Sequence, residues 1–181
     1  MSAPSGPDRG HLATEAANPR SADLERLSAA EAVELMVSED RSAVAAVEAA
    51  SHELAALIEV TSEKLAAGGR LVYVGAGTSG RLAVLDASEC PPTFGVDPGQ
   101  VRAIIAGGER ALRHPVEGAE DDGPAGAAAV EALDVSRADV VVGITAGGTT
   151  PFVHGALERA RDLGAATGFI ACVPREQRAD D

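Results

Sequence analysis

The sequence predicts an α/β fold: a three-layer α/β/α sandwich with a parallel, Rossmann-like sheet, preceded by an N-terminal helical arm. After residue 70, short apolar runs alternate with helix-like segments, which is the pattern of parallel strands joined by crossover helices. Two loops rich in glycine and threonine each follow one of these apolar runs. The chain has 181 residues, which is long enough for one such domain with its own core.

Composition predicts three regions along the chain. Residues 1–10 are rich in Ser, Pro and Gly and are predicted to be a disordered N-terminal extension. Residues 11–55 are predicted to form the helical arm, and residues 56–181 the α/β domain.

Two helices are predicted in and after the arm. Ser28 and Glu31 have the spacing of a capping box, which opens a helix over residues 29–37. Asp40 is the predicted N-cap of a long amphipathic helix over residues 41–67. We expect these helices to serve packing and dimer formation rather than chemistry.

The central feature is a glycine-rich loop, residues 75–80 (GAGTSG), between a buried strand over 71–74 and a helix over 81–87. Glycines allow positive φ and a close approach of ligand to backbone, and a helix N-terminus holds anions well. The hydroxyls of this loop suit a phosphate monoester. The candidate phosphate-binding residues here are Gly77, Thr78, Ser79 and Gly80.

The same glycines also fit the bare spacing of a dinucleotide-binding fingerprint, G-x-G-x-x-G. That motif requires an acidic residue about 20 residues further on, at the end of the second strand. The second apolar run, residues 101–106, ends at Gly107-Gly108-Glu109, about ten residues too late for this role. A sugar phosphate is therefore favoured over a dinucleotide.

The rest of the chain continues the alternation of strands and helices. The predicted strands are 101–106, 139–144 and 166–172, and the predicted helices are 124–133 and 152–163. Ligands of such sheets bind outside the carboxyl ends of the strands, where both glycine loops are expected to lie.

The second loop, residues 143–151 (GITAGGTTP), also joins a strand to a helix, and Pro151 suits the first helical turn. A tight strand-to-helix turn would explain it without a ligand. Two such loops at matching places favour a shared phosphate site. Its candidate residues are Thr145, Gly148, Thr149 and Thr150.

Two groups of carboxylates lie in the predicted crossover segments. Glu89 is expected to follow the first helix of the domain and precedes Pro91-Pro92, which restrain its backbone. Glu117, Glu120, Asp121 and Asp122 follow the second strand. Composition alone favours a solvated surface for such a cluster. Its position near the carboxyl ends of the strands, where ligands bind, favours a catalytic role.

Two further residues were considered for chemistry. Cys90 lies beside Glu89 and could be a nucleophile, but the sequence shows no histidine or basic neighbour that would lower its pKa. Packing is therefore the favoured role for Cys90. His114 could polarise a sugar oxygen, but a surface position without a chemical role is the favoured interpretation.

Net charge and cysteine content limit the kinds of partner and site that the chain can have. The net charge of −13 argues against nucleic acid or an anionic membrane. Two cysteines indicate neither a disulfide framework nor a metal site, and no signal peptide or long apolar stretch is present. A cytoplasmic location is expected.

The stretches GAGTSGRLAVLDASECPPTFGV, IIAGG and VEGAEDD resemble the N-acetylmuramic acid 6-phosphate etherases, a branch of the sugar-isomerase (SIS) domain superfamily. The resemblance covers roughly residues 12–174. It implies a SIS fold and a reaction that cleaves the lactyl ether of a 6-phosphosugar to give N-acetylglucosamine 6-phosphate and D-lactate. It also implies that Glu89 is the proton donor and Glu120 the base, with no metal and no cofactor.

The resemblance further implies a homodimer whose active site takes residues from both subunits. Two departures are visible in the second loop: Gly147 stands where the family usually has Ser, and Thr149 where it usually has Arg. Members of the family also continue beyond the point where this chain ends in REQRADD, so the chain is expected to be shortened at its C-terminus, leaving its fourth strand at an edge of the sheet.

Two other functions remain open from the sequence. An aldose–ketose isomerase would use the same phosphate loops but gives no reason for the second acidic motif. A non-catalytic sugar-phosphate sensor, or an inactive fragment, would keep the loops without turnover.

Overall fold

The computed structural model describes residues 13–174, and the chain divides into two compact units, Met1–Ile58 and Glu59–Asp181. The predicted disordered extension, residues 1–10, and the REQRADD tail lie outside the described residues.

The first unit is dominated by helix α1 (Ala29–Ala49), and α2 (Ser51–Ala66) begins in it. The predicted capping box is confirmed: the Glu31 N–H donates to Ser28 Oγ at 3.3 Å and the Ser28 N–H donates to Glu31 Oε2 at 2.8 Å. The predicted N-cap at Asp40 is wrong, since Asp40 lies inside α1. No glycine or proline interrupts residues 29–49, so the helix continues past Asp40.

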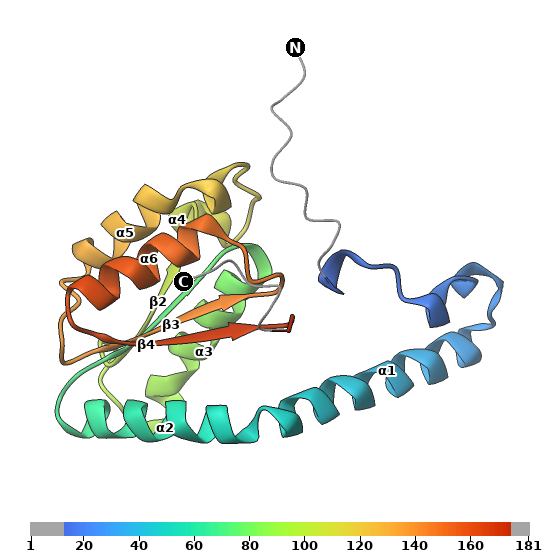
Figure 1. The fold of residues 1–181 in the computed structure, drawn as a ribbon, viewed down its shortest axis with the longest axis horizontal. Coiled ribbons are helices and arrows are strands. Elements are labelled where there is room, and N and C mark those ends of the chain that lie inside the picture. The colour runs from blue at the N-terminus through green and yellow to red at the C-terminus, as the bar shows by residue number, and fades with distance from the viewer. Residues whose placement is uncertain (1–12, 175–181) are drawn as a thin grey trace, which may run out of the picture. The chain divides into compact units, whose positions relative to one another are not determined.

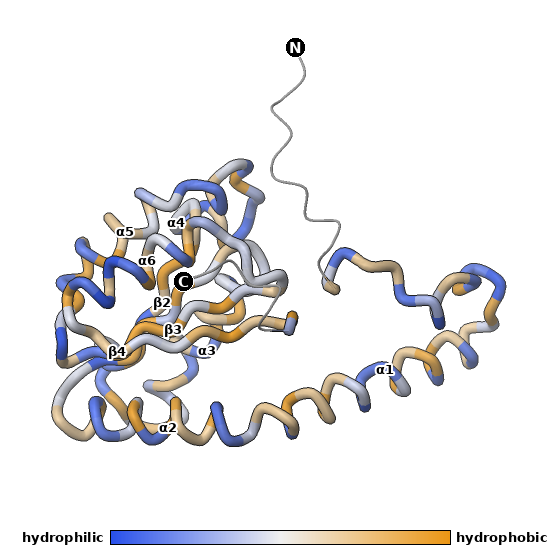
Figure 2. The backbone as a smooth tube through the Cα atoms, viewed as in Figure 1, coloured by the Kyte–Doolittle hydropathy of each residue, from blue (hydrophilic) through white to orange (hydrophobic). Residues whose placement is uncertain are grey.

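Three short 3₁₀ turns precede α1: Ala13–Glu15 (η1), Pro19–Ser21 (η2) and Leu24–Arg26 (η3). The second of them, η2, is tied to α1 by polar contacts, because its N-cap Asn18 donates from Nδ2 to Glu39 Oε2 at 2.7 Å and Arg20 pairs with the same carboxylate. No residue of α1 is buried, and apolar and polar residues alternate along it (Figure 2).

The second unit contains a parallel sheet of four strands in the order β2-β1-β3-β4. The strands are β1 (Leu71–Gly75), β2 (Val101–Ile105), β3 (Val140–Thr145) and β4 (Ala166–Ala171). Each predicted strand is confirmed to within one residue at either end, and β4 lies at an edge of the sheet, as expected.

Helices cover both faces of this sheet, which confirms the three-layer sandwich (Figure 1). Helix α3 (Gly77–Phe94) covers one face, and α5 (Gly123–Ala132) and α6 (Pro151–Asp162) cover the other (Figure 1). The short α4 (Gly108–Ala111) and the 3₁₀ turn η4 (Ala119–Asp121) lie in the β2–α5 connection and were not predicted.

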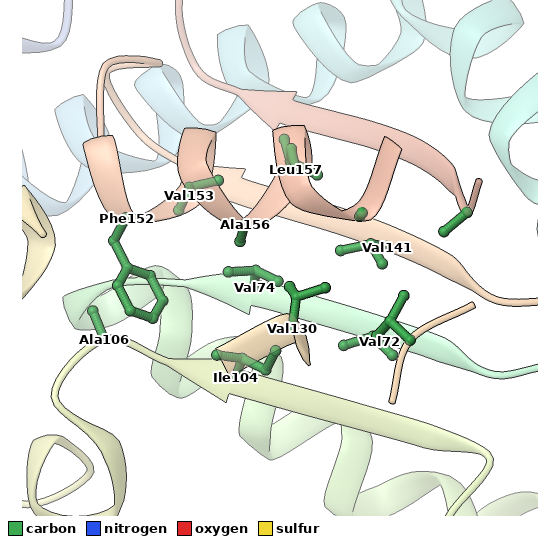
Figure 3. Close-up of a cluster of buried hydrophobic side chains, with 13 residues drawn as sticks. Val72, Val74, Ile104, Ala106, Val130, Val141, Phe152, Val153, Ala156 and Leu157 are labelled. Atoms are coloured by element: carbon green, nitrogen blue, oxygen red, sulfur yellow. The ribbon is translucent and has the colours of Figure 1, made fainter. Parts of the chain in front are cut away.

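The hydrophobic core lies between the sheet and the α5/α6 layer. Val72, Val74 and Val141 from the strands pack against Phe152 and Leu157 of α6 (Figure 3). Valine, leucine and alanine supply most of this core because the chain is only 2% aromatic.

Helices α5 and α6 pack backbone to backbone, which requires glycine at both contacts. A Cβ on Gly126 would lie 2.0 Å from the Phe152 carbonyl oxygen. A Cβ on Gly155 would lie 2.2 Å from the Gly123 carbonyl oxygen. This close contact fixes α6 against α5 and so sets the direction in which the N-terminus of α6 points.

An ion pair between the partly exposed Arg70 and the buried Asp139 joins the amino ends of β1 and β3. Arg70 Nη2 lies 2.9 Å from Asp139 Oδ2, and the Arg70 N–H donates to Asp139 Oδ1 at 2.9 Å. Arg70 Nη1 and Nη2 also donate to the carbonyl oxygens of Leu133 and Asp134, respectively, both at 3.0 Å. The Ser136 N–H also donates to Asp139 Oδ2, at 2.9 Å. This cluster holds the sheet together at the edge opposite the glycine loops.

Candidate functional site

The first glycine loop is built by close packing of α3 on the sheet. A Cβ on Gly80 would lie 2.6 Å from Ile105 Cγ1, and one on Gly75 would lie 2.7 Å from the Gly80 nitrogen. Gly77 differs from both, because its φ of +53° requires a left-handed turn while the space beside it is open. Gly75 and Gly80 therefore serve packing, and Gly77 is the glycine that a ligand can approach.

Helix α3 begins at Gly77, four residues earlier than the predicted start at Arg81. The positive φ at Gly77 turns the chain into the helix at once, and the Gly80 N–H already donates to the Ala76 carbonyl at 3.2 Å. Thr78 and Ser79 thus lie in the first turn, where backbone N–H groups have no partner within the helix. This is the arrangement that binds anions.

The second loop is organised by Thr145, which is 5% exposed. Its Oγ1 accepts a hydrogen bond from the Gly148 N–H at 2.7 Å, and Gly148 has a φ of +75°. His154 of α6 lies with Nε2 2.8 Å from the Gly148 carbonyl oxygen, a contact that sequence reasoning did not predict. The loop is therefore held from both sides.

Both loops leave the carboxyl edge of the sheet from neighbouring strands, since Gly75 of β1 pairs with Ile144 of β3. Thr149 and Thr150 lie half-buried at the start of α6, and Thr150 makes no side-chain hydrogen bond to cap that helix. The register thus brings the two predicted phosphate loops side by side, as the parallel topology requires.

A cavity of about 230 Å³ opens at the N-terminus of α3. It is enclosed by the end of β1, the first turn of α3 and the β2–α5 connection. Its lining residues are Ala76, Gly77, Arg81, Ala106, Ala111, Pro115, Val116, Glu117, Gly118, Ala119 and Glu120. Of the predicted site residues it contains Gly77 and Glu120, while Arg81 was not predicted.

The acidic cluster after β2 divides into different roles. Glu117 and Glu120 line the cavity. Asp122 caps α5, because its Oδ1 accepts from the Ala125 N–H at 2.9 Å. The left-handed Gly118, with a φ of +74°, starts the η4 turn that carries Glu120. Glu120 thus reaches the cavity because a turn absent from the prediction redirects the chain.

Glu89 lies elsewhere. The predicted helix end before Glu89 is wrong, since α3 runs through Pro91 and Pro92 to Phe94 and is capped by Gly95 with a φ of +66°. Glu89 follows Gly77 by twelve residues on one helix, which places their Cα atoms about 18 Å apart along its axis. The exposed Glu89 does not line the cavity, so within one chain the structure does not bring the two glutamates together there.

A polar trio on the α3 face of the sheet was missed by sequence reasoning. Burial, followed by a hydrogen bond to Asp86, raises the pKa of Tyr73. Burial, followed by the Asp86 charge, raises the pKa of the Cys90 thiol. A raised thiol pKa disfavours a nucleophile, which agrees with the packing role predicted for Cys90. His114 is exposed, as favoured.

Within residues 13–174 no helix combines the length and apolar character that crossing a membrane requires. No three His, Cys, Asp or Glu side chains within that range gather in a way that could hold a metal ion.

Comparison with known proteins gives close relatives. N-acetylmuramic acid 6-phosphate etherases are 60% identical in Gloeobacter violaceus, 58% in Nostoc punctiforme and 55% in Synechococcus elongatus, over 94%, 96% and 97% of this chain. The matches cover 56%, 56% and 57% of those relatives, so the chain spans little more than half their length.

A solved structure supports the fold independently. Phosphoheptose isomerase of Neisseria gonorrhoeae superposes with a TM-score of 0.54 and 20% identity, covering 80% of this chain and 74% of that one. A family model described as the glucokinase regulatory protein N-terminal SIS domain matches residues 50–161. That span includes β1 to β3, both glycine loops and the cavity. With its four-stranded parallel sheet and the close etherase relatives, the chain therefore belongs to this SIS-domain family.

Proposed function

We propose that the protein is an N-acetylmuramic acid 6-phosphate etherase, a carbon–oxygen lyase that releases D-lactate and leaves N-acetylglucosamine 6-phosphate. The proposal rests chiefly on one observation: relatives of that name are 55–60% identical over nearly the whole chain. The cavity supports it, because an acidic residue and an anion-binding helix start lie at one place.

The sugar phosphate would bind at the carboxyl edge of the sheet. The first-turn N–H groups of α3 and the hydroxyls of Thr78 and Ser79 would hold the phosphate. Thr145 already accepts from Gly148, so its own O–H proton is free to be donated to a phosphate oxygen. Gly77, Gly148, Thr149 and Thr150 complete the proposed binding residues, while Gly80 supports the loop by packing against Ile105.

The chemistry follows from acid–base catalysis on the open-chain sugar. Glu120 would remove the proton at C2, next to the aldehyde. The C3–O bond would then break, with Glu89 donating a proton to the departing lactate oxygen. Water activated by the resulting Glu89 carboxylate would add at C3 while Glu120 returns its proton to C2. Both glutamates are then restored, and the net change is uptake of one water and release of one lactate. No cofactor is needed for these steps.

A homodimer would complete this site. Leu82 and Leu85 are 57% and 58% exposed, and they share one side of α3 with Glu89. An apolar helix face next to a functional carboxylate suits a contact with a second copy of the chain. Docking there would bring Glu89 to the cavity of the other copy, whereas Glu89 does not reach the cavity of its own chain.

The reaction would belong to amino-sugar recycling or catabolism in the cytoplasm. A phosphorylated sugar is retained in that compartment, because its charged phosphate does not cross a lipid bilayer. Neither nucleic acid nor membrane is proposed as a partner.

Incubation of the purified chain with N-acetylmuramic acid 6-phosphate, followed by an assay for D-lactate, tests the proposal. We expect lactate and N-acetylglucosamine 6-phosphate in equal amounts. Fructose 6-phosphate and glucosamine 6-phosphate, incubated in parallel, should remain unchanged. Interconversion of those two sugars would instead favour an isomerase, and binding of any of these sugars without turnover would favour a sensor.

A further inference from the structure

Arg81 is the one cationic side chain among the described residues that line the cavity. Its Nε donates to the Leu112 carbonyl oxygen at 3.2 Å, which anchors the guanidinium to the β2–α5 connection. Within residues 13–174 no carboxylate lies close enough to form an ion pair with Arg81, although Glu117 and Glu120 line the same cavity. The two terminal NH₂ groups are therefore available to a ligand.

An oriented guanidinium with two available NH₂ groups is well suited to a planar anion. It presents parallel N–H donors that match the two oxygens of a carboxylate. The proposed substrate carries two anions, a tetrahedral phosphate on C6 and a planar carboxylate on the lactyl group. Arginine can bind either anion in this way, but the start of α3 already offers converging N–H groups and hydroxyls to the phosphate, which leaves Arg81 for the carboxylate.

We propose that Arg81 binds the lactyl carboxylate and thereby distinguishes the ether substrate from sugar phosphates that lack it. This inference rests on the etherase function proposed above. Glu117 and Glu120 would repel an incoming carboxylate in a chain whose net charge is −13, so a fixed cation in the cavity offsets that repulsion. Arg81 is a positioning residue in this scheme, because it holds the lactyl group beside the carbon that loses it.

The test compares two ligands that differ only in the lactyl group. Binding of N-acetylmuramic acid 6-phosphate and of N-acetylglucosamine 6-phosphate is measured by calorimetry in a Glu120→Gln background, which keeps the ether intact. We expect Arg81→Met to weaken binding of the first ligand about 10- to 100-fold and binding of the second less than about 3-fold. Arg81→Lys, which retains the charge and the alkyl stem, should fall between the parent and the Met variant.

Arg102→Met is the matched control, since it removes the same charge from an exposed position on β2 that does not line the cavity. It should leave both affinities unchanged. If Arg81→Met weakens the binding of both ligands equally, Arg81 contacts the phosphate or supports the fold, and this inference alone is overturned. The inference is also overturned if Arg81→Met weakens the binding of neither ligand. Failure of the parent to bind either sugar would overturn the proposed function as well. If Arg81→Met does not fold, the ratio of the two affinities in Arg81→Lys decides the matter.

Discussion

Asp139 is the residue on which the amino edge of the sheet depends most, and it is 2% exposed. Burial disfavours its carboxylate, but hydrogen bonds from Arg70 and from the Ser136 N–H outweigh that cost and hold the pKa of Asp139 below its usual range. The bond to Asp139 in turn raises the pKa of Arg70.

A carboxyl whose pKa is lowered by folding adds stability above its unfolded pKa, about 3.9, and loses it as the pH falls through the lower folded value. We expect Asp139→Asn to lower the free energy of unfolding by about 3 kcal/mol at pH 7 in urea titrations, because it leaves Arg70 partly unpaired. The difference from the parent should shrink on lowering the pH from 5 to 2. Asp162→Asn removes an exposed partner of Arg159 at 3.8 Å and should change stability by less than about 0.5 kcal/mol. A constant difference at all pH values would contradict the role given to the Asp139 charge.

At this scale the sequence identified some site residues and missed others for a physical reason. Gly77 was predicted from the chemistry of the glycine loop, which is visible in one dimension, whereas Glu120 was singled out from its acidic cluster by the family resemblance. Arg81 was not, because its role depends on the Leu112 carbonyl and on a turn at Gly118 that brings the β2–α5 connection to α3.

At the scale of the element, α3 is fixed by contact rather than by helix propensity. Alanine is a better helix former than glycine by about 1 kcal/mol, so Gly80→Ala would stabilise an isolated helix. On the sheet the new methyl group would meet Ile105 and the Gly75 carbonyl oxygen, the latter at 2.8 Å.

We therefore expect Gly80→Ala to destabilise the protein by about 1–3 kcal/mol in chemical denaturation. Ser79→Ala, the neighbouring position in the same helical turn, is the control and should be neutral to within about 0.5 kcal/mol. A Gly80→Ala variant as stable as the parent would show that α3 can shift away from β1 without cost.

The strands of the sheet were predictable because short apolar runs bounded by glycine define them locally. The ends of the helices were harder to predict. The helix was predicted to end before Glu89, yet α3 continues through Pro91 and Pro92 to Phe94. Its last turn is closed by the Gly95 N–H, which donates to the Pro91 carbonyl oxygen at 2.8 Å. Asp40 was taken as a helix start, although nothing before it ends α1.

At the scale of the whole molecule, Glu89 does not line the cavity of its own chain, and the proposed homodimer would supply it from a second copy. Glu89→Gln and Glu120→Gln should each abolish lactate release when studied alone. Co-expressed in equal amounts, they should recover about a quarter of the parent activity, because half of the dimers are mixed and each mixed dimer carries one intact site.

A mixture of Glu89→Gln with the double variant is the control and should stay inactive, since no pairing of these chains restores both glutamates to one site. An active parent together with an inactive first mixture would show that both glutamates act within one chain, and the dimer arrangement proposed here would be wrong.

The packing of Gly75 against Gly80 also affects how such a sequence can diverge. Both glycines are needed for the helix to lie on the strand, so selection for folding alone preserves them, whether or not a ligand binds. A descendant that had lost its substrate would still carry the motif by which the loop is recognised. Neutral drift would show first at Thr78 and Ser79, whose side chains the fold does not require, so these two positions report the history of the site better than its glycines do.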